Sequence, residues 1–220
     1  MRALVIGASG GIGAALAAAL SQQGAEVLGL SRSRDGLDIT DEASIAAHLD
    51  RLSGAFDTVI VATGALALGD MAPEKSLRSL TEAALLGQFA VNAMGPALVL
   101  KHAARLLPRD RPARFAALSA RVGSIGDNAL GGWYSYRAAK AALNQLIHTG
   151  AIELARSHPQ AVVVSLHPGH VATGLSAAFG GTLPSVSPDA AANYILGVLD
   201  QLTPTETGGF FDWAGKPIVW

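Results

Sequence analysis

A cluster of glycines near the start of the chain limits its fold more than any other feature. Four glycines lie between residues 7 and 13, after an apolar segment (Ala3–Ile6) and before a helical stretch (Ala14–Gln23). A strand, a glycine-rich turn and a helix open a phosphate-binding βαβ unit, in which the helix N-terminus faces the anion. The alternative for the glycines alone is a tight turn that binds nothing. The full context favours an α/β fold that holds a dinucleotide.

Apolar, branched segments recur along the chain between helical patterns. Strands that alternate with helices predict a parallel sheet with helices on both faces, so we expect one doubly wound Rossmann-like domain over residues 1–220. The expected strands are residues 3–6, 26–30, 58–62, 114–119, 161–166 and 210–213. The expected helices are residues 11–23, 42–52, 77–107, 133–157 and 188–201, with Pro96 kinking or dividing the third.

One interval breaks this alternation. Residues 31–38 are too few for a crossover helix between the second strand and Leu37–Ile39, because a parallel return needs about a dozen residues. Either the usual helix is missing here, or Leu37–Ile39 is not a regular parallel strand.

Composition narrows the classes of function. The chain has 220 residues, a net charge of -1 and no cysteine, and half of its residues are hydrophobic. Without a basic stripe there is no electrostatic footprint for nucleic acid or an anionic membrane. The longest Ala/Leu run, Ala14–Leu20, is too short to span a bilayer, and the lack of cysteine agrees with a cytoplasmic location. We expect a cytoplasmic protein with a small-molecule partner.

Tyr136 and Lys140 form the strongest catalytic signal. Four residues apart on a predicted helix, they project from the same face, so the ammonium is expected to lower the pKa of the phenol. Tyr134 has Ala138 at the same spacing and therefore lacks such a partner. A tyrosine proton donor beside a dinucleotide cradle indicates hydride transfer to a carbonyl.

With Gly7-Ala8-Ser9-Gly10-Gly11-Ile12-Gly13 and Tyr136-Arg137-Ala138-Ala139-Lys140 the chain resembles the short-chain dehydrogenases/reductases. Residues 123–128, 131–137 and 141–144 look most like the branch that contains C-factor signalling proteins and carbonyl reductases. The resemblance runs by motif from residue 7 to residue 173. It implies an NAD(P)H-dependent oxidoreductase in which Tyr136 is the general acid/base, Lys140 holds the nicotinamide ribose, and Asn92 helps hold a water relay to the lysine.

The family's catalytic serine is missing. Members end the fifth strand with Ser-Ser, and the position of the second serine, aligned through Gly123, is Ala120. Ser124 is expected to bind the substrate carbonyl in its place, whereas Ser119 is expected to pair with backbone at the strand end. The catalytic residues implied are Asn92, Ser124, Tyr136 and Lys140.

The second strand bears on the choice of cofactor. Ser31 stands where an NAD-binding member carries an acid, and Arg32 follows it, which favours NADP(H) because a guanidinium suits a 2′-phosphate. Nearby Asp35 keeps NAD(H) open. The resemblance implies cofactor contacts from Gly7, Ser9, Gly10, Gly11, Ile12, Gly13, Ser31, Arg32, Asp38, Ile39, Ala62, Thr63, Gly64, Tyr136, Lys140, Pro168, Gly169, Val171 and Thr173. Among these, Ala62 replaces the family's usual asparagine.

Two functions compete. An NADP-preferring carbonyl reductase or alcohol dehydrogenase is favoured by Tyr136, Lys140 and Asn92, whereas a dinucleotide-binding sensor or signalling protein with weak or no turnover is favoured by Ala120. A hydrolase is set aside because the Gly-x-Ser-x-Gly elbow is absent.

Three further expectations concern ligands and partners. No metal is expected, because His167 and His170 have no further ligand cluster. Small and apolar residues between Gly174 and Pro184 suggest a lid over an apolar carbonyl compound. The resemblance also implies a homodimer or homotetramer built through the long helices around Leu98 and Leu146.

Overall fold

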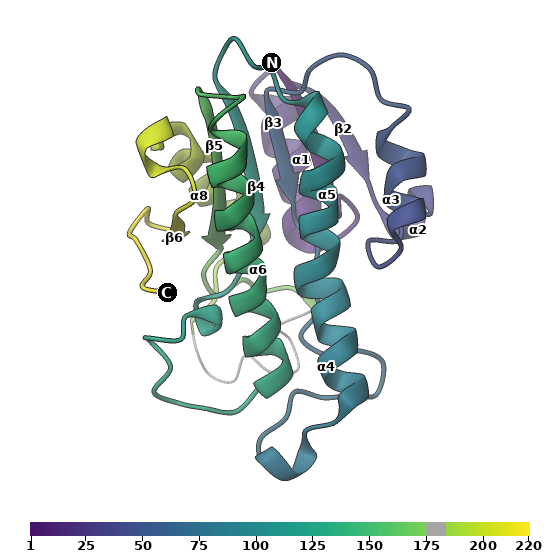
Figure 1. Cartoon of the computed structure of the whole chain (residues 1–220), viewed down its shortest axis with the longest axis vertical. Helices are drawn as coiled ribbons and strands as arrows, with labels where there is room; N and C mark the ends of the chain where they lie inside the picture. The colour runs from purple at the N-terminus through teal and green to yellow at the C-terminus, as the bar shows by residue number, and fades with distance from the viewer. Residues whose placement is uncertain (175–183) are drawn as a thin grey trace.

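A parallel sheet with helices on both faces forms the centre of the protein (Figure 1). The computed structural model describes residues 1–174 and 184–220. Within these residues the strand order is β2-β1-β3-β4-β5-β6, and every neighbouring pair is parallel. The strands are β1 (Arg2–Ile6), β2 (Glu26–Leu30), β3 (Thr58–Val61), β4 (Ala113–Leu118), β5 (Ala161–His167) and β6 (Phe210–Asp212). The doubly wound, Rossmann-like fold is therefore confirmed.

The helices divide between the two faces of the sheet. The described helices are α1 (Gly11–Gln22), α2 (Arg32–Asp35), α3 (Glu42–Leu49), α4 (Glu82–Phe89), α5 (Gly95–Ala103), α6 (Tyr134–Leu154) and α8 (Pro188–Gln201). One core cluster joins α3, α5 and α6 to the sheet, and a second joins α1 and α8 to the opposite face (Figure 1). Both clusters follow from the alternation of side chains along each strand: Leu4 and Ile6 face the first, Ala3 and Val5 the second.

The irregular interval after β2 holds only the short helix α2. The Ser31 hydroxyl accepts a hydrogen bond from the Arg34 amide and so caps this helix, and Gly36 ends it in the left-handed region (φ 76°). Leu37–Ile39 pairs with no strand of the sheet. The second of the two alternatives therefore holds: this segment is not a regular parallel strand. β2 consequently lies at the edge of the sheet.

The long helix expected at residues 77–107 is divided in the structure. A single helical turn at Leu77–Ser79 precedes α4, whose N-cap is Thr81. The kink expected at Pro96 takes the form of a π-helical turn over Ala90–Met94, directly before α5. Pro96 has no amide hydrogen, and the wider turn accommodates the missing bond.

The same segment is the one described helix long and apolar enough to cross a membrane, judged by length and composition alone. In Glu82–Leu106, 44% of the most apolar window is buried inside the protein. Its residues contact α3 and α6, as those of a core helix do.

Candidate active site

The glycine turn after β1 is packed too tightly for side chains. Gly7 has φ +90°, and a Cβ on Gly13 would lie 2.1 Å from the Gly7 carbonyl oxygen. A Cβ on Gly7 itself would lie 2.9 Å from the Ala62 carbonyl oxygen, which brings the end of β3 against the turn. Glycine is therefore required here for the close approach of β1, β3 and α1, and the turn remains open to a ligand of the backbone amides.

The N-terminus of α1 lies beside the loop that follows β5. Gly10 is the N-cap and has no side chain that could accept from the first helical amides. A Cβ on Gly11 would lie 2.9 Å from Cγ2 of Thr173, so the two segments meet. In addition, the buried Oγ1 of Thr63 has no hydrogen-bond partner within the described residues. A helix N-terminus, a cradle that any Cβ would fill and an orphaned hydroxyl fit the pyrophosphate and ribose of a dinucleotide.

The residues after β2 surround the expected adenosine end. Ser31 is tied to Asp35, whose Oδ2 accepts from the Ser31 amide at 2.7 Å and from its hydroxyl at 3.2 Å. Arg32 is exposed. Asp38 accepts from the amide and the hydroxyl of Thr40 at 2.8 and 2.7 Å, and these hydrogen bonds lower the pKa of its carboxyl group.

Tyr136 and Lys140 are both buried at the start of α6, with exposed fractions of 8% and 2%. Burial raises the pKa of Tyr136 to about 12 and lowers that of Lys140 to about 7. The lysine Nζ lies 5.9 Å from the centroid of the tyrosine ring and donates to the Leu118 carbonyl at 2.9 Å. The expectation that the ammonium lowers the phenol pKa is wrong, because burial of the phenol raises its pKa.

Asn92 lies in the π-helical turn and fixes the loop after β3. Its Oδ1 accepts from the Ala65 amide at 3.1 Å, and its Nδ2 donates to the Ala65 carbonyl at 2.8 Å and to Gln88 Oε1 at 2.5 Å. A Cβ on Gly64 would lie 2.9 Å from Asn92 Oδ1 and 3.5 Å from Lys140 Nζ. Asn92, Gly64 and Lys140 thus meet at one point, although the water relay itself stays a prediction.

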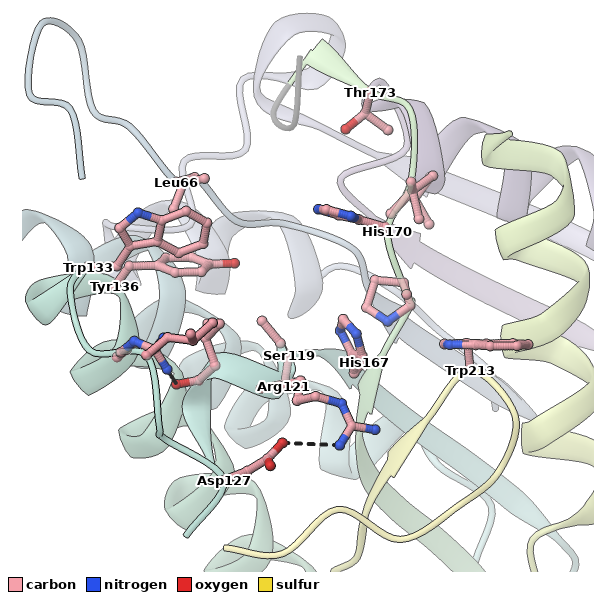
Figure 2. Close-up of a pocket in the computed structure, with 18 residues that line it drawn as sticks. Leu66, Ser119, Arg121, Asp127, Trp133, Tyr136, His167, His170, Thr173 and Trp213 are labelled. Carbon is pink, nitrogen blue, oxygen red and sulfur yellow. Dashed lines mark hydrogen bonds and ion pairs between the residues drawn. The ribbon is translucent and has the colours of Figure 1, made fainter. Parts of the chain in front are cut away.

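A cavity of about 570 Å³ opens in front of Tyr136, whose hydroxyl points into it (Figure 2). Its lining includes Ile12 from the first turn of α1 and Thr173 from the loop after β5, so the cavity reaches the glycine turn. Pro168, Gly169 and Val171, expected around the nicotinamide, also line it. The lid expected between Gly174 and Pro184 lies almost wholly outside the described residues.

The two serines differ in position. Ser119 lines the cavity beside Ala120, and its Oγ donates to Asn144 Oδ1 at 2.7 Å, so the backbone pairing expected for it is wrong. Ser124 is buried and is not among the described residues that line the cavity; its Oγ accepts from the Asp127 amide at 3.1 Å. Carbonyl binding by Ser124 stays a prediction.

Several functional contacts were missed by sequence reasoning. Glu74 is buried, and its carboxylate accepts from the Ser135 amide at 3.3 Å and hydroxyl at 2.5 Å, at the first turn of α6. Trp133, the residue just before α6, adopts left-handed geometry (φ 52°) and lines the cavity. No local signal marks Glu74, which is separated from Ser135 by 61 positions.

Arg121 was also missed. It follows Ala120, lines the cavity and forms ion pairs with Asp127 (3.2 Å) and Asp212 (3.1 Å). A charged residue three positions after the end of an apolar strand was the available signal. His167 and His170 also line the cavity, but residues 1–174 and 184–220 contain no group of three or more His, Cys, Asp or Glu side chains able to hold a metal.

Fold and site together define an NAD(P)-dependent oxidoreductase. The glycine turn, the helix N-terminus and the buried Tyr136/Lys140 pair share one edge of the sheet, as this class requires. More narrowly, the chain belongs to the short chain dehydrogenase family, whose model matches residues 1–182.

Individual relatives agree with this assignment. The chain is 31% identical over 232 residues to 1-hydroxy-2-glutathionyl-2-methyl-3-butene dehydrogenase from Rhodococcus sp. (strain AD45), covering 99% of this chain and 98% of the relative. It is 38% identical over 136 residues to C-signal from Myxococcus xanthus, covering 60% of this chain and 76% of the relative. A short-chain dehydrogenase/reductase from Burkholderia multivorans with bound NADP superimposes with a TM-score of 0.82 at 27% identity, covering 100% of this chain and 99% of that chain.

Proposed function

We propose that the protein is an NADP(H)-dependent carbonyl reductase with Tyr136 as its general acid. One observation carries the proposal: the Tyr136 hydroxyl points into a cavity that extends to the glycine turn (Figure 2). Lys140 is buried nearby, with its Nζ 5.9 Å from the centroid of the Tyr136 ring. A carbonyl group in that cavity lies within reach of a proton donor on one side and of the cofactor cradle on the other.

The residues of the site would have different roles, which follow from their positions. The glycine turn and the α1 N-terminus would hold the pyrophosphate, Lys140 the nicotinamide ribose, and Val171 and Thr173 the carboxamide. When bound, NADPH supplies the hydride that the carbonyl carbon receives. Tyr136 gives its phenolic proton to the carbonyl oxygen, so that the product is an alcohol.

The test is reduction of a panel of aldehydes, ketones and quinones by purified protein with NADPH. We expect Tyr136→Phe to lower turnover on the order of a hundredfold or more while leaving the affinity for NADPH nearly unchanged, since it removes a proton and no binding surface. Tyr134→Phe is the matched control, because Tyr134 lies outside the cavity lining and four positions before Ala138. Equal turnover in wild type and Tyr136→Phe would remove Tyr136 from the mechanism.

The preference for NADP(H) rests on Arg32 and on Ser31. Ser31 carries no charge and caps α2, and Arg32 is exposed at the start of that helix. The opposing feature is the Asp35 carboxylate, which binds Ser31. The NADP-bound Burkholderia relative supports the same preference. Calorimetric titration is expected to give a lower dissociation constant for NADPH than for NADH.

A second candidate is a dinucleotide-binding sensor with weak or no turnover. It is favoured by Ala120, which lines the cavity where the family carries a hydroxyl, and by the similarity to C-signal. A sensor would bind NADPH with ordinary affinity and reduce none of the panel. Restored reduction in Ala120→Ser would support this candidate.

We also propose that the protein is a cytoplasmic homodimer or homotetramer. The helix α4 lies on the same side of the sheet as α5 and α6 (Figure 1). It carries exposed apolar side chains, including those of Leu86 and Phe89. Sedimentation analysis that finds a monomer at micromolar concentration would contradict the assembly.

A further inference from the structure

We propose that the substrate is a carbonyl compound that carries a carboxylate, and that Arg121 binds this carboxylate inside the cavity. The inference rests on the proposed carbonyl reduction and names its substrate class. Figure 2 shows the Arg121 guanidinium on the side of the cavity that faces Asp127 and Trp213, apart from the Tyr136 hydroxyl. A substrate that fills the cavity can therefore meet both groups, with its carbonyl at one end and its charge at the other.

Asp212 fixes the guanidinium without occupying its whole donor set. Its Oδ2 pairs with Arg121 Nη2 at 3.1 Å, and its Oδ1 accepts from the amides of Ala214 at 2.9 Å and Lys216 at 3.0 Å. The Asp212 side chain is only 9% exposed. The Asp212 carboxylate divides its hydrogen bonding between two backbone amides and the Arg121 guanidinium, which it orients. The remaining N–H groups of Arg121 stay available to a planar, bidentate acceptor.

The second partner of Arg121 is one that a ligand can replace. Asp127 Oδ2 lies 3.2 Å from Nη1, and the two side chains are 45% and 47% exposed. Ion pairs this exposed contribute about 0–1 kcal/mol, so breaking one costs little. A substrate carboxylate that takes the place of Asp127 makes the same type of contact with Arg121 Nη1.

The rest of the lining matches an apolar body with one negative charge. Leu66, Val122 and Leu130 supply apolar walls. Arg137 adds a second guanidinium, which donates to backbone carbonyls of Gly132 at 3.0 Å and Val122 at 3.3 Å. The described lining thus holds two arginines and one aspartate. Burial lowers the pKa of His167 to about 4, so this side chain adds no charge at neutral pH.

The experiment compares keto acids with their methyl esters, using purified protein and NADPH. Levulinate and its longer-chain homologues present the same ketone at increasing distance from the carboxylate, and each ester removes only the charge. We expect kcat/KM for the best acid to exceed that for its ester about tenfold or more, as charge-assisted hydrogen bonds imply. Arg121→Met should abolish this preference, and Arg121→Lys should retain part of it.

Asp127→Asn separates recognition from folding. It removes the competing carboxylate and leaves Arg121 on Asp212, so the acid-to-ester ratio should rise several-fold, an outcome that misfolding cannot produce. Asp200→Asn is the matched control, because it removes the same unit of charge far from the cavity. Asp200 pairs with Arg114 at 3.2 Å on the exposed surface. The ratio in Asp200→Asn should equal that of wild type.

The outcomes distinguish this inference from the proposed function. Reduction of esters and acids at equal efficiency overturns the carboxylate site and leaves carbonyl reduction standing. If no ketone is reduced but levulinate homologues bind in calorimetry, and Arg121→Met abolishes that binding, the site stands and the reductase does not. Absence of both turnover and binding overturns both.

Discussion

Burial decides the protonation states of the two central residues. Tyr136 and Lys140 lie so far inside the protein that their pKa values move to about 12 and about 7. A tyrosine with a raised pKa stays protonated at neutral pH, which suits the donor role in carbonyl reduction. The reverse reaction needs tyrosinate and is disfavoured under the same conditions.

The direction of catalysis is therefore expected to depend on pH. Reduction uses protonated Tyr136, so its kcat/KM should be nearly flat between about pH 6 and pH 9 with respect to this group. Oxidation of the corresponding alcohol needs the deprotonated form, so its rate should keep rising through about pH 10. Measuring kcat/KM in both directions across this range checks the prediction. An oxidation rate that levels off near neutral pH would show that the bound cofactor lowers the phenol pKa.

Lys140 should make stability depend on pH. Its pKa falls from 10.5 to about 7 on folding, so the unfolded chain binds more protons between these values, and stability rises with pH across that window. Lys140→Met lacks the effect. Urea unfolding should show wild type gaining up to about 1.4 kcal/mol per pH unit relative to Lys140→Met between pH 7 and pH 10. Below pH 7 the two curves should run parallel.

The raised pKa of Tyr136 sets the upper pH limit for comparing the stability of wild type with that of Lys140→Met. A phenol with a pKa of about 12 when folded and 10.0 when unfolded stabilises the protein below pH 10, and this contribution is lost as pH rises towards 12. Parallel wild-type and Lys140→Met curves between pH 7 and pH 10 would contradict the buried state of the lysine.

At the scale of elements, the first turn of α6 positions Tyr136, and Glu74 stabilises this turn from a distant loop. Its carboxylate pairs with the amide and hydroxyl of Ser135, next to Tyr136. A carboxylate at a helix N-terminus also interacts favourably with the helix dipole. The left-handed conformation of Trp133 just before the helix makes this external cap more important, because the Trp133 side chain makes no cap hydrogen bond.

Glu74→Ala is expected to lower the free energy of unfolding by about 1–3 kcal/mol, because it leaves the buried Ser135 hydroxyl and amide without their charged acceptor. Turnover should fall with it, since Tyr136 belongs to the same turn. Chemical denaturation and steady-state kinetics on one preparation check both effects. Glu82→Ala, at the exposed start of α4, is the matched control. It should change the free energy of unfolding by no more than about 0.5 kcal/mol and leave turnover unchanged.

Local patterns in the sequence predicted most of these elements. Contacts between residues far apart in the sequence could not be predicted in this way. The glycine turn and the Tyr136/Lys140 pair were readable because their geometry depends on spacing within one turn or helix. The contact of Arg121 with Asp212 joins residues 91 positions apart, so no window of sequence contains it. The pKa of Tyr136 was mispredicted for a related reason: spacing reveals the neighbouring charge, whereas depth of burial depends on the whole fold.

For the whole molecule, the sheet brings two functions to one edge. The glycine turn after β1 and the segment after β2 form the proposed cofactor side, while β4, β5 and α6 supply the proposed substrate cavity. Thr173 joins the two sides where it meets Gly11. The carboxyl ends of parallel strands meet at one edge, so the sequence could bring these segments together once the strand order was known. The position of each side chain within the cavity needed the structure.

Because the proposed cofactor contacts come from so many segments, NADPH should stabilise the whole fold. A ligand present at a hundred times its dissociation constant adds about 2.7 kcal/mol, which corresponds to a rise in Tm of about 5–11 °C for a chain of this size. Arg32→Ala removes the side chain proposed to bind the 2′-phosphate, so at the same concentration it should reduce the shift given by NADPH and leave that given by NADH unchanged. Thermal unfolding of wild type, Arg32→Ala and the neighbouring control Arg34→Ala, each with both cofactors, provides the measurement. An equal loss for NADPH and NADH would show that Arg32 does not distinguish the phosphate, and an equal effect of Arg34→Ala would assign the recognition to general positive charge at α2.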